Sequence, residues 1–287
     1  MSTWQPYHAE QHTVVGDLRI WHDFHSPQLD NRRDVLVWLP PEYVDSSRRY
    51  PVLYMHDAQN LFDRTGSYSG EWEVDETLTA LAQEGLDAIV VGLPNMREMR
   101  GVEYCPYPFR TYEGAQAEGR GDDYIRFIIE TVKPQIDRDF RTLPEAETTG
   151  IAGSSMGGLI SLYGFLAYPE VFGLCGSFSP AYWFGENGLL ATVQQRSTGH
   201  GRVYLDVGTK EGETLHGWLN IFGEEADNTY RDGVRDLRDA LLSRGYTLEQ
   251  NLMYVEDEGA PHRESAWAAR LPAALRFLLA QTRETTA

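Results

Sequence analysis

The sequence predicts an α/β protein in which a mostly parallel β-sheet is covered by helices on both faces. After the first 45 or so residues, short apolar runs alternate with amphipathic segments of helix length. The runs are apolar on both faces, as expected of parallel strands buried between two helical layers. Two strand-like runs, 13–24 and 34–39, come before the alternation. They predict an antiparallel N-terminal edge on the sheet.

Local signals delimit the individual elements. Pro40 and Pro41 end the second run because proline cannot donate a hydrogen bond to a neighbouring strand. Gly85 and Gly245 follow two of the helical segments as stop signals. The eight predicted strands are 13–24, 34–39, 52–55, 88–91, 148–152, 174–178, 203–207 and 252–255. The predicted helices are 73–83, 123–136, 156–167, 225–243 and 264–281.

The remaining stretches set the domain organisation. Residues 94–121 show little periodicity and are rich in Tyr, Pro and Arg, which predicts a long surface loop. Only about 22 residues, 181–202, separate the sixth and seventh predicted strands, too few for a large lid. Eight strands in one sheet fit a single domain over residues 1–287.

The charge balance argues against nucleic-acid and membrane partners. Lys and Arg number 25 and Asp and Glu 43, giving a net charge of −18 and a pI of about 4.8. Such a surface repels phosphate backbones and anionic lipid heads. No apolar run reaches the roughly 20 residues that span a bilayer, and the first residues lack a signal-peptide pattern. With only two cysteines, Cys105 and Cys175, we expect a cytoplasmic protein with reduced thiols.

The segment Gly153-Ser154-Ser155-Met156-Gly157 is the one G-x-S-x-G pattern in the chain. It lies between an apolar run and a helical segment, the strand–turn–helix setting in which this pattern exposes a nucleophilic serine. The turn would hold the Ser155 hydroxyl at a helix N-terminus, where the Met156 N–H can stabilise an oxyanion. The alternative is a glycine-rich turn in a protein without catalysis.

A serine nucleophile needs a base and an acid, and in this architecture the chain order is serine, acid, histidine. Among eight histidines, His262 alone follows the last predicted strand, in a turn rather than an amphipathic stripe. His56 ends another strand but precedes the serine. Glu211 lies in the turn after residues 203–207 and is the predicted acid. We expect its carboxylate to lie near the surface. The competing acids are Asp206, Glu213, Asp227 and Asp257.

Other parts of the predicted site come from residues just past strand ends. The second oxyanion donor is expected at Ala58 or Gln59, in the loop after residues 52–55. The predicted pocket wall consists of Trp72, Tyr182 and Trp183, with the loop from Arg100 to Tyr104 over them. No phosphate-binding glycine loop or metal-ligand motif occurs, so we expect no cofactor and no metal.

Several motifs together resemble the putative-esterase family of α/β-hydrolases. That family includes feruloyl and acetyl-xylan esterases, enterochelin esterases, S-formylglutathione hydrolases and mycolyltransferases. The resemblance covers about residues 30–270, and its motifs lie at residues 54–63, 71–72, 100–104, 153–159, 179–180, 206–211 and 262–267. It implies an α/β-hydrolase fold with Ser155 as nucleophile, His262 as base and Glu211 as acid. Relatives often have Gly where this chain has Ala58, which affects the oxyanion loop.

The predicted function is a serine carboxylic-ester hydrolase that forms an acyl-enzyme. An open cleft without a large lid favours small-molecule or carbohydrate-borne esters with short acyl groups. Acyl transfer to a sugar hydroxyl would use the same residues. A siderophore-lactone esterase is a further alternative, since Arg97, Arg100 and Arg110 could meet an anionic substrate. From a different class, a catalytically silent carbohydrate-binding module could share the scaffold.

Overall fold

The computed structural model describes residues 4–67, 69–111, 114–196, 198–215 and 221–280. Its main feature is a nine-stranded sheet in the order β1-β2-β3-β5-β4-β8-β9-β10-β11. The strands from β5 to β11 are parallel, whereas β1, β2, β3 and β5 pair antiparallel to one another. Their bounds are β1 Gln5–Pro6, β2 Asp17–Ser26, β3 Asn31–Leu39, β4 Val52–His56, β5 Ile89–Leu93, β8 Thr149–Ser154, β9 Leu174–Phe178, β10 Arg202–Lys210 and β11 Leu252–Pro261.

This arrangement confirms the α/β prediction and its antiparallel N-terminal edge, with one correction to the strand count. The sheet has nine strands rather than eight, because Gln5–Pro6 pairs with β2 as an additional edge strand. Two exposed residues, one of them a proline, carry no hydrophobic period from which a strand could be predicted.

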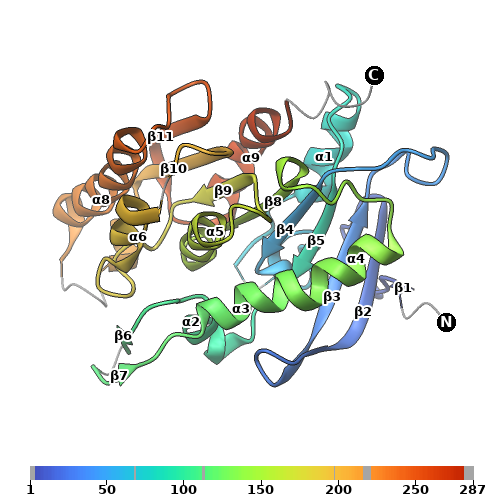
Figure 1. Cartoon of the computed structure of the whole chain (residues 1–287), viewed down its shortest axis with the longest axis horizontal. Helices are drawn as coiled ribbons and strands as arrows, with labels where there is room; N and C mark the ends of the chain where they lie inside the picture. The colour runs from blue at the N-terminus through green and yellow to red at the C-terminus, as the bar shows by residue number, and fades with distance from the viewer. Residues whose placement is uncertain (1–3, 68, 112–113, 197, 216–220, 281–287) are drawn as a thin grey trace.

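Helices cover both faces of the sheet (Figure 1). The helices are α1 Val74–Ala82, α2 Arg100–Glu103, α3 Gly121–Phe127, α4 Lys133–Asp139, α5 Met156–Ala167, α6 Gly188–Arg196, α8 Gly223–Ser243 and α9 Glu264–Leu279. A π-helical turn, Ile128–Val132, joins α3 to α4. Apolar residues of α1 and α9 share one buried cluster with the sheet, and those of α3, α5, α6 and α8 share another. The two clusters therefore form the two sides of a three-layer core.

The predicted surface loop 94–121 is more ordered than its sequence suggests. It contains α2 and a small hairpin, β6 Phe109–Arg110 with β7 Gln116–Ala117. An ion pair anchors α2: Arg33 NH2 on β3 lies 2.8 Å from Glu103 Oε2, and both side chains are buried. Asn31 Nδ2 donates a second hydrogen bond to Glu103. This buried pair holds α2, and with it Arg100, against the carboxyl ends of the central strands.

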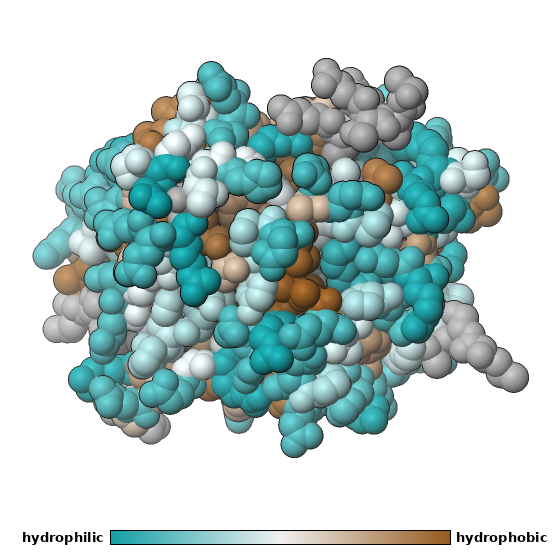
Figure 2. All heavy atoms as spheres, viewed as in Figure 1, coloured by the Kyte–Doolittle hydropathy of each residue, from teal (hydrophilic) through white to brown (hydrophobic). Residues whose placement is uncertain are grey.

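Hydrophilic residues dominate the face of the molecule shown in Figure 2, and apolar residues form patches among them. Within the described residues, no helix combines the length and apolar character needed to cross a membrane. Cys105 and Cys175 are both buried and unpaired with each other.

Candidate active site

Ser155 lies at a sharp turn between β8 and α5. Its backbone has φ 57° and ψ −119°, a conformation that costs a non-glycine residue of order 1–3 kcal/mol. Neighbouring backbone holds the turn: the Ser155 N–H donates to the Phe178 carbonyl at 2.9 Å, and the Ala181 N–H donates to the Ser155 carbonyl at 2.9 Å. The serine is therefore fixed by β9 and the residues after it, as well as by its own strand and helix.

Glycines make this turn possible through close packing. A Cβ on Gly153 would lie 2.9 Å from both the Gly157 carbonyl carbon and His56 Cδ2. A Cβ on Gly158 would lie 2.8 Å from the Phe178 carbonyl oxygen. At Gly157 itself the nearest atoms would be 3.4 Å away, an ordinary contact. The tightest constraints thus fall on Gly153 and on Gly158, and the second of these lies outside the five-residue motif.

The structure brings His262 and Glu211 together from two neighbouring strands. Glu211 directly follows β10, and His262 directly follows β11. His262 Nδ1 lies 3.0 Å from Glu211 Oε2. Since a carboxylate only accepts hydrogen bonds, this contact places the ring proton on Nδ1 and leaves Nε2 as the basic nitrogen.

Ser155 and His262 line the same cavity, of about 320 Å³. No hydrogen bond from the Ser155 hydroxyl is present in the part of the chain that the structure describes. Such contacts are commonly loose in ligand-free enzymes and tighten when substrate binds.

Glu211 is almost wholly buried, contrary to the expectation of a carboxylate near the surface. Its Oε1 atom accepts hydrogen bonds from the Ser179 hydroxyl at 2.7 Å and from the Gly208 N–H at 2.6 Å. Of these partners, only His262 contacts the other carboxylate oxygen, Oε2. The competing acids make different contacts: Asp206 and Asp257 bind Arg270, Asp227 binds Lys210 and the Gly212 N–H, and Glu213 is exposed.

Arg270 on α9 connects these buried groups. Its Nε atom lies 2.7 Å from Asp206 Oδ2, and its NH2 atom donates to the Ser179 hydroxyl at 3.1 Å. Trp267 Nε1 also donates to the Ser179 hydroxyl, at 2.9 Å. Burial raises the pKa of Asp206 to about 6, although Arg270 acts in the opposite direction. Sequence reasoning missed Ser179, Trp267 and Arg270 as supports of Glu211, because the contacts of Trp267 and Arg270 depend on how α9 packs and those of Ser179 on the turn after β9.

His56, the rival histidine, lies beneath the serine turn rather than in a position to serve as a base. It is 1% exposed, and its Nδ1 atom lies 2.8 Å from the Tyr124 hydroxyl. Burial lowers its pKa to about 3, and the nearby Arg100 lowers it further against the opposing effect of Asp57. The imidazole is therefore neutral across the physiological range.

The loop after β4, where the second oxyanion donor is predicted, forms a tight turn. Asp57 takes a left-handed conformation, φ 57° and ψ 45°, and starts the short helical turn Ala58–Asn60. The first amides of a helical turn have no partner within it, so the Ala58 and Gln59 N–H groups stay available. The Ala58 methyl packs against Gly92, where an added Cβ would lie only 2.8 Å away. Gly92 thus makes room for the side chain of Ala58.

Two of the five predicted pocket residues, Trp72 and Arg100, line the cavity together with Ser155 and His262, and Gln59 lines it too. Arg100 is held by a bidentate contact with Asp57 at 2.9 and 2.8 Å. Burial acts to raise the pKa of Asp57, but Arg100 and Asn95 outweigh it and the pKa is lowered. Much of the positive charge of Arg100 is consequently matched by Asp57.

The structure places the other three predicted pocket residues away from this cavity. Tyr104 is fully buried and accepts a hydrogen bond from the Asp57 N–H at 3.3 Å. The Tyr182 hydroxyl donates to the Thr229 carbonyl on α8. Trp183 packs on Tyr230, which itself contacts the His262 ring. Cavity-lining residues that the sequence analysis did not select include Asn60, Ser69, Asn95, Glu264 and Trp267.

Comparisons with known proteins identify the family. Residues 26–278 match the family model described as putative esterase. The chain belongs to the putative esterase family. It is therefore a carboxylic-ester hydrolase with the α/β-hydrolase fold.

Individual proteins resemble this esterase in sequence or in fold. It is 26% identical over 258 residues to the uncharacterized protein YbbA of Bacillus subtilis (strain 168), covering 89% of this chain and 95% of YbbA. The BES protein from Bacillus cereus has a similar structure, with a TM-score of 0.69 and 20% identity over 96% of this chain and 99% of that one. The siderophore hydrolase EstA from Aspergillus nidulans gives a TM-score of 0.69 and 17% identity, with 99% of each chain covered. At these identities the solved structures show a shared fold.

The buried, neutral His56 predicts a defined pH dependence of stability. An unfolded histidine has a pKa of about 6.5, so between pH 6.5 and 5 the unfolded state gains a proton that folded His56 does not. This histidine should therefore lower the free energy of unfolding as pH falls, by roughly 1.5 kcal/mol over that interval. Denaturant unfolding at pH 6.5 and 5.0 should show the esterase losing about that much more stability than its His56→Gln variant. His25→Gln, which alters an exposed histidine on β2, should follow the wild type; equal losses in all three proteins would contradict the assignment.

Proposed function

We propose that this esterase uses Ser155 as nucleophile, His262 as general base and Glu211 as the acid, and that it works through an acyl-enzyme. The observation that carries the proposal is the 3.0 Å contact between His262 Nδ1 and Glu211 Oε2, beside a cavity that Ser155 and His262 both line. The three residues come from the ends of β8, β10 and β11, in the chain order serine, acid, histidine.

In the first step, His262 Nε2 takes the hydroxyl proton as Ser155 Oγ forms a bond to the ester carbonyl carbon. The tetrahedral intermediate then expels the alcohol, which leaves with the proton from His262, and the acyl group stays on Ser155. In the second step, a water molecule gives a proton to His262 and attacks the acyl-enzyme. The carboxylic acid leaves, the proton returns to Ser155, and the enzyme is restored. Glu211 keeps the ring oriented and stabilises the imidazolium in both steps.

The negative oxygen of each intermediate would bind backbone N–H groups at two places. The Met156 amide is the first of α5, so it has no partner within the helix and lies at the positive end of the helix dipole. Ala58 or Gln59 would supply the second donor from the turn after β4. A donor of this kind contributes about 10²–10³-fold in kcat in serine hydrolases.

We further propose a substrate with a short acyl group and a small or carbohydrate alcohol. The cavity is modest, and many of its lining side chains are polar, including Gln59, Asn60 and Asn95. Helix α6 and its flanking turns are the only described elements between β9 and β10. Hydroxyl-rich alcohols suit such polar walls, whereas a long acyl chain needs a deep apolar channel.

A siderophore ester is the second candidate, favoured by the resemblance to the siderophore hydrolase EstA. Arg100 in the cavity wall is the residue that would meet an anionic substrate, but Asp57 already matches much of its charge. Hydrolysis of acetylated xylo-oligosaccharides and of a catecholate trilactone, compared by kcat/KM, would separate the two. Transfer of the acyl group to an added sugar hydroxyl would appear as a new sugar ester in the same assays.

We also propose that the chain forms a single domain and works in a reducing, cytoplasmic setting. The two buried free thiols support the reducing setting.

The nucleophile can be tested by covalent labelling. A fluorophosphonate should add its mass once, at Ser155, and Ser155→Ala should abolish both labelling and hydrolysis of p-nitrophenyl acetate. Ser154→Ala is the matched control, because Ser154 also lines the cavity but ends β8 rather than occupying the turn. It should retain both labelling and activity. Labelling at Ser154, or activity remaining in Ser155→Ala, would refute the assignment.

The acid can be separated from its neighbours by kinetics. Glu211→Gln should lower kcat by about 10³–10⁴-fold, because an amide can donate to the imidazole and favour the wrong tautomer. It should also lower stability, since Glu211 is buried among hydrogen-bond donors. Asp257→Asn changes a partly exposed carboxylate on the same network and should keep most of the activity. The measurements are kcat for each variant and thermal unfolding; a larger kcat loss in Asp257→Asn would assign the acid to that residue.

The choice of acyl group can be tested with p-nitrophenyl esters. Each buried CH₂ is worth about 0.8 kcal/mol, so a deep acyl channel would favour longer chains until it filled. We expect kcat/KM to be highest from acetyl to butyryl and to fall by octanoyl. Trp72→Leu should shift the optimum towards longer chains because Trp72 forms the cavity wall, whereas Trp183→Ala, behind Tyr230, should not. A wild-type optimum at decanoyl would refute the shallow cleft.

A further inference from the structure

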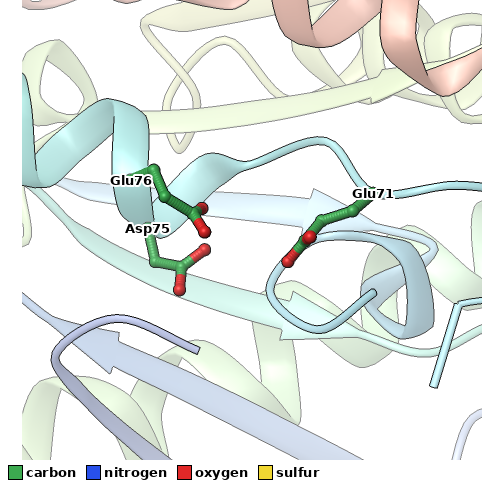
Figure 3. Close-up of side chains that lie close together, drawn as sticks. All are labelled: Glu71, Asp75 and Glu76. Carbon is green, nitrogen blue, oxygen red and sulfur yellow. The ribbon is translucent and has the colours of Figure 1, made fainter. Parts of the chain in front are cut away.

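Three carboxylates gather away from the catalytic cavity, where the loop before α1 meets the start of that helix. They belong to Glu71, Asp75 and Glu76, and each offers an oxygen within 4.8 Å of the others. Figure 3 shows the three side chains directed toward the same space. In the described part of the chain, this is the one group of acidic, histidine or cysteine side chains with the spacing of metal ligands.

The burial of this cluster leaves its negative charge poorly matched. Asp75 is fully buried and Glu71 nearly so. Asp75 Oδ1 and Glu76 Oε2 are both shielded from solvent and have no hydrogen-bond partner. The nearby cation is Arg64, whose Nε atom lies 3.7 Å from Glu71, but its side chain is 67% exposed and offers weak compensation. Buried carboxylate oxygens without partners are costly, so something else should occupy the space between them.

The surrounding backbone accounts for part of the arrangement only. Asp75 and Glu76 lie in the first turn of α1, where the helix dipole favours negative charge. The Val15 N–H donates to Asp75 Oδ2 at 2.6 Å, and the Thr13 hydroxyl donates to Glu71 at 3.0 Å. These contacts leave Asp75 Oδ1 and Glu76 Oε2 without a partner, and both residues belong to the cluster.

We infer that Glu71, Asp75 and Glu76 bind a hard divalent cation, with Ca²⁺ as the ion of matching size. Ca²⁺ takes oxygen ligands at about 2.3–2.6 Å in flexible geometry, so ligands on opposite sides of the ion stand up to about 5 Å apart. Mg²⁺ requires about 2.0–2.1 Å and a strict octahedron, and it gives up its waters reluctantly, so it suits a buried cluster of carboxylates less well. Glu71 also lines a second cavity, of about 370 Å³, together with Arg64 and Glu73. That cavity gives an ion and its waters a route to the cluster.

The bound ion would tie the N-terminal segment to a wall of the catalytic cleft. Thr13 and Val15 bind Glu71 and Asp75, which flank the loop position of Trp72, a cavity-lining residue. We therefore expect the bound ion to act mainly on the stability of the fold. The inference does not depend on the catalytic triad, and its test needs no activity measurement.

The alternative to a cation is a proton shared within the cluster. Burial, together with the neighbouring Glu76, raises the pKa of Asp75 to about 8. A shared proton would relieve the repulsion without any metal. The two cases differ in their response to Ca²⁺, because a site that holds only a proton gains no stability from the ion.

Thermal unfolding of the full chain distinguishes them. The esterase is treated with EDTA, moved to chelator-free buffer and titrated with CaCl₂. We expect a saturable rise in Tm of about 5 °C at 100-fold excess over Kd, a smaller rise with MgCl₂, and one Ca²⁺ bound per chain by calorimetry. Asp75→Asn should abolish the response while keeping or raising the Tm measured in EDTA, because it removes one of the repelling charges.

Two further variants keep the test decisive. Glu76→Gln alters a partly exposed ligand and should also lose the response, should Asp75→Asn fail to fold. Glu73→Gln removes a charge from the same loop outside the cluster and should respond as the wild type does. An unchanged wild-type Tm in both Ca²⁺ and Mg²⁺ would overturn the inference in favour of a shared proton. Equal responses in the wild type, Asp75→Asn and Glu76→Gln would overturn it in favour of nonspecific binding to the acidic surface, and a larger shift with Mg²⁺ would overturn the choice of ion.

Discussion

The buried guanidinium of Arg270 is the constraint on which the geometry of the site depends. Asp206 lies inside β10 with no exposure, and Arg270 on α9 supplies the charge that makes its burial tolerable. Removing one partner of such a pair costs about 3–5 kcal/mol, so α9 is strongly fixed relative to β10. Glu211 immediately follows β10, and only Arg263 separates His262 from the start of α9. The distance between His262 and Glu211 thus depends on the ion pair between Arg270 and Asp206, to which neither residue belongs.

A second constraint acts from the other side of the cleft. The strained turn at Ser155 persists because Phe178 and Ala181 hydrogen-bond to its backbone, and because Gly153 and Gly158 allow strand and helix to approach. Residues after β9 therefore serve both halves of the site: Ala181 holds the serine, and Ser179 holds the acid. Ser179 itself has a φ of 42°, so local backbone strain occurs at both positions.

The sequence predicted what depends on local pattern and failed where contacts come from distant segments. Apolar runs and helical periods located eight strands and five helices, and G-x-S-x-G selected Ser155 because its requirement is a local turn. The hydrophobic pattern did not predict α6 or β1, because both elements are short and weakly periodic. Tyr182 and Trp183 follow a strand end as pocket residues do, and Tyr104 lies in the loop expected over them. The side chains of Tyr104, Tyr182 and Trp183 instead contact Asp57, Thr229 and Tyr230, respectively. The burial of Glu211 also depends on α9, which comes more than 50 residues later.

The two free cysteines are both fully buried, but they lie in elements that differ in how far the fold must open to expose them. Burial raises the pKa of the Cys175 thiol on β9, a strand enclosed by β8 and β10, so a thiol reagent reaches it only when the sheet itself separates. Burial raises the pKa of Cys105 to about 11, but this residue lies just after α2 and outside the sheet, so a local opening of that segment exposes it while the sheet remains intact. Modification of Cys105 therefore reports local opening beside the cleft, and modification of Cys175 reports loss of the whole fold. The rates at which the two thiols are modified therefore measure a local and a global opening of the same esterase.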